Sequence, residues 1–146
     1  MNEAFLDPTT RLYAICAAVL VIKMSFTGYA TAVLRNLKGV FISPEDYAFR
    51  GKAPQPPDEQ IERLRRAHRN DLENILPFLV VGLLAAKSGA VGYRTAWWLF
   101  VPFTTVRVLH TMAYAFGIQP WRSILFGIGD LALLATTLLL LITVIL

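Results

Sequence analysis

Residues 96–116 read AWWLFVPFTTVRVLHTMAYAF, an apolar stretch long enough to cross a lipid bilayer as a helix. Its polar side chains are not scattered, because Arg107, His110, Thr111 and Tyr114 stand at i, i+3, i+4 and i+7 and share one helix face. A charged side chain near the bilayer centre costs about 2.5–3.5 kcal/mol, so such residues normally face a bundle interior or a water-filled site. The stretch therefore predicts a membrane helix whose polar face is turned toward the rest of the protein.

A second polar face precedes another apolar run, at residues 75–86. Arg66, Arg69, Asn70 and Glu73 repeat the same spacing and share one side of a helix. Guanidinium groups grip carboxylates in a bidentate geometry, and an asparagine can hydrogen-bond a peptide group. Two helices with such faces predict a site for an anionic ligand.

The composition indicates an integral membrane protein. The chain has 146 residues, of which 55% are hydrophobic, and its mean hydropathy is +0.52, beyond an ordinary soluble domain. Eight of the fourteen Lys and Arg residues lie from Arg35 to Arg69, which places that loop on the cytoplasmic side. We predict an all-α, four-helix membrane bundle in one domain, residues 1–146, with spans at about 12–34, 66–87, 96–116 and 121–146 and a cytoplasmic loop at 35–65.

Helix-start signals divide that loop. Ser43 can cap a helix, Pro44 suits its first position, and Glu45 and Asp46 favour its positive end, so a short helix is expected there. Asp58 follows a proline-rich break and is expected to cap the helix that leads into the second span.

Three charges inside the spans need partners. Lys23 interrupts the first span and is expected to pair with Asp71 or Glu73. Asp130 lies well inside the fourth span, and we expect Arg107 to be its partner. Arg107 is thus interpreted mainly as a member of an ion pair inside the bundle.

Some classes of site find no support in the sequence. Cys16 is the single cysteine, so it cannot form an internal disulfide and is interpreted as a packing residue. His68 and His110 have no cysteine or carboxylate at metal-binding spacing beside them, so no metal is expected. The basic loop abuts two spans and carries no nucleic-acid motif, so no nucleic-acid partner is expected.

Four segments carry recognisable motifs. The most specific is ERLRRAHRNDLENILPF at residues 62–78, and the others are VFISPED at 40–46, RVLHTMAY at 107–114 and PWRS at 120–123. Together they resemble the MAPEG family, membrane-associated proteins in eicosanoid and glutathione metabolism. The resemblance covers roughly residues 20–127 and fits the branch of microsomal glutathione transferases and microsomal prostaglandin E synthases.

The resemblance implies a homotrimer of four-helix subunits that holds glutathione, the co-substrate, between neighbouring subunits near the cytoplasmic face. Arg122 would stabilise the reactive thiolate, and Ser123 would hydrogen-bond the sulfur. Asp46 stands at the position of a debated partner of that arginine, and Phe126 replaces a tyrosine of the synthase. The residues that would bind glutathione by motif position are Arg35, Arg66, Arg69, Asn70, Glu73, His110 and Tyr114.

Other polar residues near these motifs are given structural roles. Arg63 and Arg65 are expected to contact lipid headgroups. His68 falls off the face that carries the expected ligand-binding residues and is interpreted as structural, and Asp46 as a helix-start residue rather than a catalytic acid.

The expected function is that of a membrane-bound glutathione transferase, which joins glutathione thiolate to hydrophobic electrophiles and also reduces lipid hydroperoxides. The alternative within the family is a glutathione-dependent isomerase of the prostaglandin E synthase type. The non-enzyme alternatives are a membrane scaffold and a small multidrug-type transporter, although a transporter of cations needs an unpaired acid in the membrane.

The expected partners are glutathione, a hydrophobic electrophile or lipid hydroperoxide that enters from the bilayer, membrane lipid and further copies of the chain. The expected location is a multi-pass position in the endoplasmic reticulum membrane of a eukaryote or the inner membrane of a bacterium.

Overall fold

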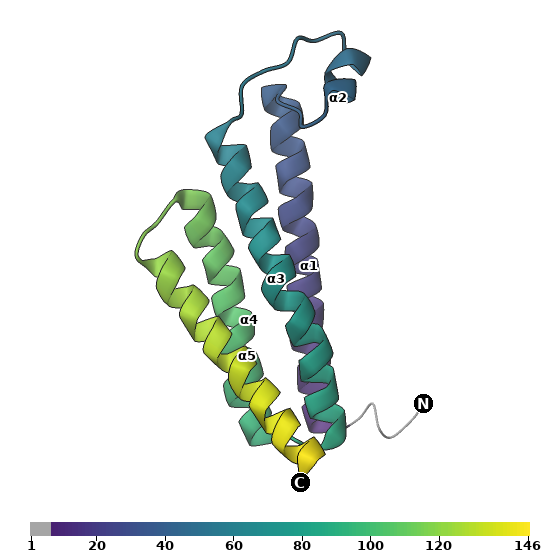
Figure 1. Ribbon diagram of the computed structural model, residues 1–146, viewed down its shortest axis with the longest axis vertical. Helices are drawn as coiled ribbons and strands as arrows, with labels where there is room; N and C mark the ends of the chain where they lie inside the picture. Colours follow the sequence, from purple (N-terminus) through teal and green to yellow (C-terminus); the bar gives the residue numbers. More distant parts are fainter. Residues whose placement is uncertain (1–6) are drawn as a thin grey trace.

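The structure is a computed structural model that describes residues 7–146. Over this range its regular elements are five helices, and Figure 1 shows the long ones packed side by side with the short one beyond the end of the first. The helices are α1 (Pro8–Lys38), α2 (Pro44–Phe49), α3 (Glu59–Ser88), α4 (Tyr93–Phe116) and α5 (Trp121–Ile145). The end of α1, the start of α3, the end of α4 and the start of α5 lie at one end of the bundle (Figure 1).

The local signals of the loop are largely confirmed. The Asp58 carboxylate accepts hydrogen bonds from the backbone N–H groups of Gln60 and Ile61 at 3.0 and 3.1 Å and caps α3. Helix α2 begins at Pro44, as predicted. Ser43 does not cap α2 through its side chain, because its hydroxyl instead donates to Asp46 Oδ2 at 3.0 Å.

Aromatic side chains form the centre of the apolar core. Phe78, Phe100 and Phe103 have no exposed surface, and the Phe78 and Phe103 rings are stacked with centroids 4.2 Å apart. Tyr13 of α1 reaches this cluster and donates its hydroxyl to the backbone carbonyl of Leu79 at 2.5 Å. Gly82 lets α1 and α3 approach there, since a Cβ at that position would lie 3.1 Å from the Tyr13 ring. The core therefore joins α1, α3 and α4.

A layer of buried charges lies beside this core, on the side of the bundle end where α3 begins. Lys23 of α1 pairs with Asp71 of α3, which confirms one of the two predicted partners. Arg107 of α4 also pairs with Asp71, at 3.4 Å, and the side chains of Asp71 and Arg107 are both fully buried. The predicted pair between Arg107 and Asp130 is wrong. Gly129 is the buried residue of α5 beside Arg107, and the next residue along a helix points about 100° away, which leaves Asp130 exposed.

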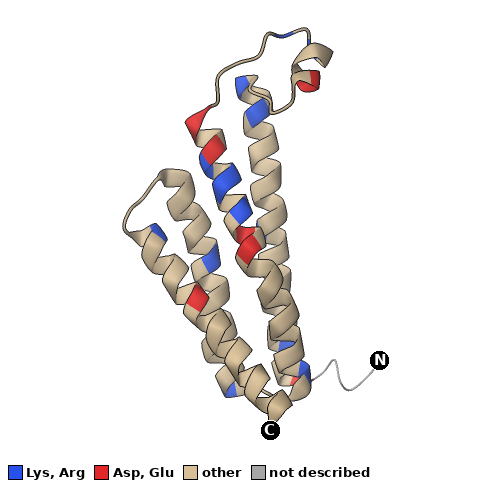
Figure 2. Cartoon of the chain, viewed as in Figure 1, with Lys and Arg blue, Asp and Glu red and all other residues tan. Residues whose placement is uncertain are grey.

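Two of the helices, α1 and α5, are long and apolar enough to cross a membrane. Most of their surface lies outside the bundle, because only 22% and 17% of their most apolar windows are buried. Helices α3 and α4 do not meet the same hydropathy criterion, since α3 begins with the charged stripe and α4 carries tryptophans, threonines and a buried arginine. Figure 2 shows that Lys and Arg residues gather on the first half of α3 and the end of α1.

The aromatic core gives a test of the fold. We expect Phe78→Ala to lower the free energy of unfolding by about 3–5 kcal/mol, because it leaves a cavity where three other rings now pack against Phe78. Thermal unfolding in detergent, followed by circular dichroism, measures this loss. Phe26→Ala is the matched control, since Phe26 is 70% exposed on α1, and an equal loss in both variants would contradict the assignment of the core.

Candidate functional site

A polar pocket opens between α3, α4 and α5 near the charged end of the bundle. Its volume is about 170 Å³. Each of the three helices contributes the end or face that carries one of the sequence motifs. The residues that line it are Asn70, His110, Tyr114, Arg122, Ser123 and Phe126.

Tyr114 contacts two other residues that line this pocket. The Tyr114 ring meets the His110 ring edge to face, with centroids 5.1 Å apart. The Arg122 guanidinium carbon lies over the Tyr114 ring, 4.6 Å from its centroid. A guanidinium this close to an aromatic ring is attracted by the ring's quadrupole. With its amide oxygen facing Arg122, Gln119 accepts one hydrogen bond from Arg122 Nη2 at 2.5 Å and one from Arg122 Nε at 3.1 Å. Among the described residues, Arg122 is therefore held at the pocket by a ring and an amide, and no carboxylate pairs with it.

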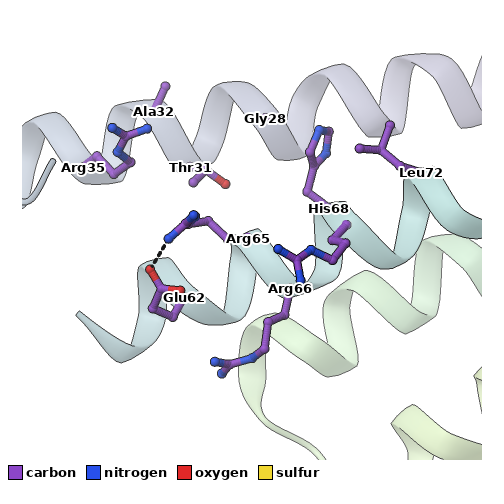
Figure 3. A pocket seen from close by; sticks show the side chains of 10 residues that line it. Gly28, Thr31, Ala32, Arg35, Glu62, Arg65, Arg66, His68 and Leu72 are labelled. Carbon is purple, nitrogen blue, oxygen red and sulfur yellow. Dashed lines mark hydrogen bonds and ion pairs between the residues drawn. The ribbon is translucent and has the colours of Figure 1, made fainter. Parts of the chain in front are cut away.

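A second, larger cavity of about 470 Å³ lies between α1 and α3 (Figure 3). Its lining is rich in bases and has one carboxylate, from Glu62. Figure 3 shows Arg65 and His68 between the two helices, while the Arg66 side chain points away from α1. The basic residues of this cavity are Arg35, Arg65, Arg66, His68 and Arg69.

Ion pairs along the first turns of α3 hold several of these bases. Arg66 pairs with Glu59 at 2.9 Å, and Arg63 binds the same carboxylate at 3.1 Å. The hydrogen bond from Arg63 has the larger effect and that from Arg66 the next, and both lower the pKa of the Glu59 carboxyl. Arg65 pairs with Glu62 at 2.6 Å. Within residues 7–146 the structure gives Arg69 no ion pair, so this exposed guanidinium is available to a ligand.

Arg35 joins the cavity to the loop that follows α1. Its guanidinium lies 3.7 Å from the Asp46 carboxylate, while its Nε is buried without a hydrogen-bond partner in the described chain. Within residues 7–146 of one chain, Asp46 therefore pairs with Arg35, and no contact with Arg122 is present. The interpretation of Asp46 as a helix-start residue fits its place in the first turn of α2.

The expected site residues fall into two groups within one chain. One group, Asn70, His110, Tyr114, Arg122 and Ser123, lines the pocket between α3, α4 and α5. The other, Arg35, Arg66 and Arg69, lines the cavity between α1 and α3. Glu73 is exposed on α3 and lines neither. Helix α3 supplies both groups from different faces, so a single chain does not bring the whole set together.

Two residues were not assigned to the site from the sequence: one that lines a cavity and one that contacts Arg122. His68 lines the basic cavity, and its Nδ1 is buried without a hydrogen-bond partner in the described part of the chain. Its position between Arg66 and Arg69 in the motif is the signal that could have placed it there. Gln119 stands three residues before Arg122, within reach of a side chain in the next helical turn, but a lone glutamine carries no recognisable signal.

Comparisons with known proteins agree with these motifs. The model of the MAPEG family matches residues 13–142. Microsomal glutathione S-transferase 1 of Bos taurus is 42% identical over 134 residues, which cover 88% of this chain and 83% of that protein. The mouse protein of the same name, from Mus musculus, is 44% identical over 119 residues, or 77% and 76% of the two chains. Prostaglandin E synthase of Homo sapiens is 38% identical over 128 residues, or 86% and 83%. The match spans nearly the whole chain and both pockets, so this membrane protein belongs to the MAPEG family.

Proposed function

We propose that this protein is a glutathione transferase of the membrane, which joins glutathione thiolate to hydrophobic electrophiles. The observation that carries the proposal is the pocket in which Arg122 and Ser123 meet Asn70, His110 and Tyr114. Relatives named microsomal glutathione S-transferase 1 at 38–44% identity support the same conclusion.

The residue types suit the chemistry of glutathione, a tripeptide with two carboxylates, one ammonium group and a thiol. Arg35, Arg66 and Arg69 offer guanidinium groups to the carboxylates. Glu73, exposed on α3, offers a carboxylate to the ammonium group. Asn70, which lines the smaller pocket, offers its amide to a peptide bond. His110 and Tyr114 complete the proposed set of ligand-binding residues.

A complete site requires a second copy of the chain. Ligand pockets usually measure about 300–1,000 Å³, and the pocket that contains Arg122 has only about 170 Å³ in one chain. The bases that would hold the carboxylates lie on the other side of α3. A homotrimer in which the basic cavity of one copy faces the Arg122 pocket of its neighbour would unite the two groups. The extensive exposed apolar surface of α1 and α5 leaves room for such contacts.

Arg122 is proposed to activate the thiol. A guanidinium beside the sulfur favours the anion, and the positive end of α5 adds to this effect, so the pKa of the bound thiol falls and its proton passes to solvent. The thiolate then attacks an electrophilic carbon, forms a C–S bond and displaces a leaving group such as halide. Ser123 donates a hydrogen bond to the sulfur, and the other ligand-binding residues fix its position.

The membrane placement follows from the charge distribution. We propose four spans, formed by α1, α3, α4 and α5 within one domain, with loop 35–65 on the cytoplasmic side. Both pockets then lie near the cytoplasmic face, within reach of water-soluble glutathione, while the electrophile enters laterally from lipid. The host membrane would be the endoplasmic reticulum in a eukaryote or the inner membrane in a bacterium.

A glutathione-dependent isomerase is the second candidate, favoured by Ser123 beside Arg122 in the pocket and by relatives named prostaglandin E synthase. The same thiolate could also reduce a lipid hydroperoxide, which converts two glutathione molecules and the hydroperoxide to glutathione disulfide, an alcohol and water. A pure scaffold has no need of Arg122, and a cation transporter has no use for a buried layer with more cations than carboxylates.

Replacement of Arg122 tests the assigned chemistry. We expect Arg122→Ala to lower turnover of a halonitroarene by about 10²–10³-fold, because a charge that stabilises the developing anion is lost. Glutathione binding should change little, while the thiolate absorbance seen on rapid mixing should disappear. Arg94→Ala, at the opposite end of α4, is the control and should keep full turnover. Unchanged turnover in Arg122→Ala would remove this residue from the mechanism.

Mixed oligomers test whether the site is shared. We expect Arg35→Ala and Arg122→Ala to be inactive alone, but a randomly mixed trimer of the two should regain about one quarter of the sites, because each site then draws one residue from each neighbour. Co-expression of Arg122→Ala with His110→Ala is the control. Both residues of that pair lie in one pocket of one chain, so no site is restored. Equal recovery in both mixtures would contradict the shared site.

A substrate panel distinguishes transferase from isomerase. We expect the purified protein with glutathione to conjugate a halonitroarene and reduce a fatty acid hydroperoxide, since both need only an activated thiolate near an apolar groove. Product analysis by mass spectrometry measures both reactions beside a prostaglandin endoperoxide. Exclusive turnover of the endoperoxide would favour the isomerase, and no turnover of any substrate would favour the scaffold.

A further inference from the structure

We infer that Asp71 is a positioning residue for the glutathione site: it anchors Arg107, and Arg107 fixes the orientation of the Asn70 side chain. The inference rests on the proposed function, because it concerns how one residue of the proposed site is held. Asp71 itself lines neither pocket.

The contacts run through one nitrogen of Arg107. Its Nη2 lies 3.2 Å from the backbone oxygen of Asn70 and 3.4 Å from Asp71 Oδ1, and it also donates to the Asn70 side-chain oxygen. The Nε and Nη1 of the same guanidinium are buried and have no partner within the described chain. Arg107 is thus held on one side only, and Asp71 supplies the only carboxylate that the described residues offer it.

The hydrogen bond from Arg107 determines which group of the Asn70 amide is left for a ligand in the pocket. Because the Asn70 side-chain oxygen accepts from Arg107, the amide nitrogen is the group left for a ligand. An amide N–H₂ donates to a carbonyl or carboxylate oxygen. An amide turned by half a rotation would present an acceptor instead and would repel such an oxygen. Arg107 therefore selects the donor side of Asn70 for the pocket.

Asp71 holds Arg107 in place against a second cation. Lys23 of α1 pairs with the same carboxylate, and the Thr111 hydroxyl donates to its other oxygen at 3.4 Å. The three charged side chains carry a net charge of +1, from two cations and one anion, and Asp71 is completely buried. Loss of Asp71 alone would leave two buried cations facing each other, which would drive Arg107 away from Asn70.

A charge-balanced variant tests this role. Lys23→Met/Asp71→Asn removes one cation and one anion, so the buried layer keeps its charge of +1 while Arg107 loses its anchor. We expect this double replacement to raise the KM for glutathione about tenfold and to change kcat by less than about twofold. In an Asn70→Ala background we expect the same double replacement to change KM less than about twofold. The two effects should differ because the effects of coupled residues are not additive. Lys23→Met, which leaves the pair between Asp71 and Arg107, should keep a near-normal KM.

Controls separate this role from general damage. Thr136→Val disturbs another buried polar residue, whose hydroxyl binds only its own helix, and should leave KM unchanged. If the double replacement raises KM equally with and without Asn70, or leaves KM unchanged in the folded protein, the positioning role is overturned. If Asn70→Ala alone has no effect on glutathione KM, the proposed site fails instead, so the two failures are distinguishable.

Discussion

The buried carboxylate of Asp71 is the interaction on which the rest of the structure depends. It meets Lys23 of α1 and Arg107 of α4, and the side chains of Asp71 and Arg107 have no exposed surface. Removing one partner of such a buried group is strongly destabilising, because an uncompensated charge stays behind. The apolar core below it is non-directional and would tolerate other arrangements of the helices. The charged layer fixes which helices meet and how far along their axes they are shifted relative to one another. It thereby sets the relative positions of α3 and α4 at the pocket.

Helix α3 organises the candidate site because it presents different chemistry on different faces. Asn70 faces α4 and α5, Arg66 and Arg69 border the cavity beside α1, and Glu73 is exposed. In the proposed homotrimer, a helix that borders two cavities would let each chain contribute residues to two different sites. The incomplete pocket of the single chain and the bare apolar surfaces of α1 and α5 fit one explanation, namely that other chains or lipid cover them.

Much of the fold could be predicted from the sequence, since local signals have local causes. Asp58 caps α3 and Pro44 opens α2, as their residue types require. The sequence offers Asp71 and Glu73 as partners of Lys23, because few acids lie within reach of a lysine at that depth, and the structure pairs it with Asp71. The predicted partner of Arg107, Asp130, is wrong, since spacing gives the face of a helix but not its rotation, and with Gly129 buried against Arg107 the Asp130 side chain points outward. The division of the site had the same cause: periodicity places Arg66 and Asn70 on one stripe, whereas the packing of α1 and α4 decides which cavity each borders.

The ring of Tyr114 under Arg122 has a consequence for the speed of the reaction. Within its own chain the Arg122 guanidinium contacts the Tyr114 ring and, with the Gln119 amide oxygen turned toward it, hydrogen-bonds Gln119. A long flexible side chain loses about 1.5–2 kcal/mol of rotamer freedom when it is ordered, and here that loss belongs to folding rather than to catalysis. Under the proposed function, the charge that stabilises the thiolate is therefore in place before the reaction, and its reorganisation during the chemical step would be small.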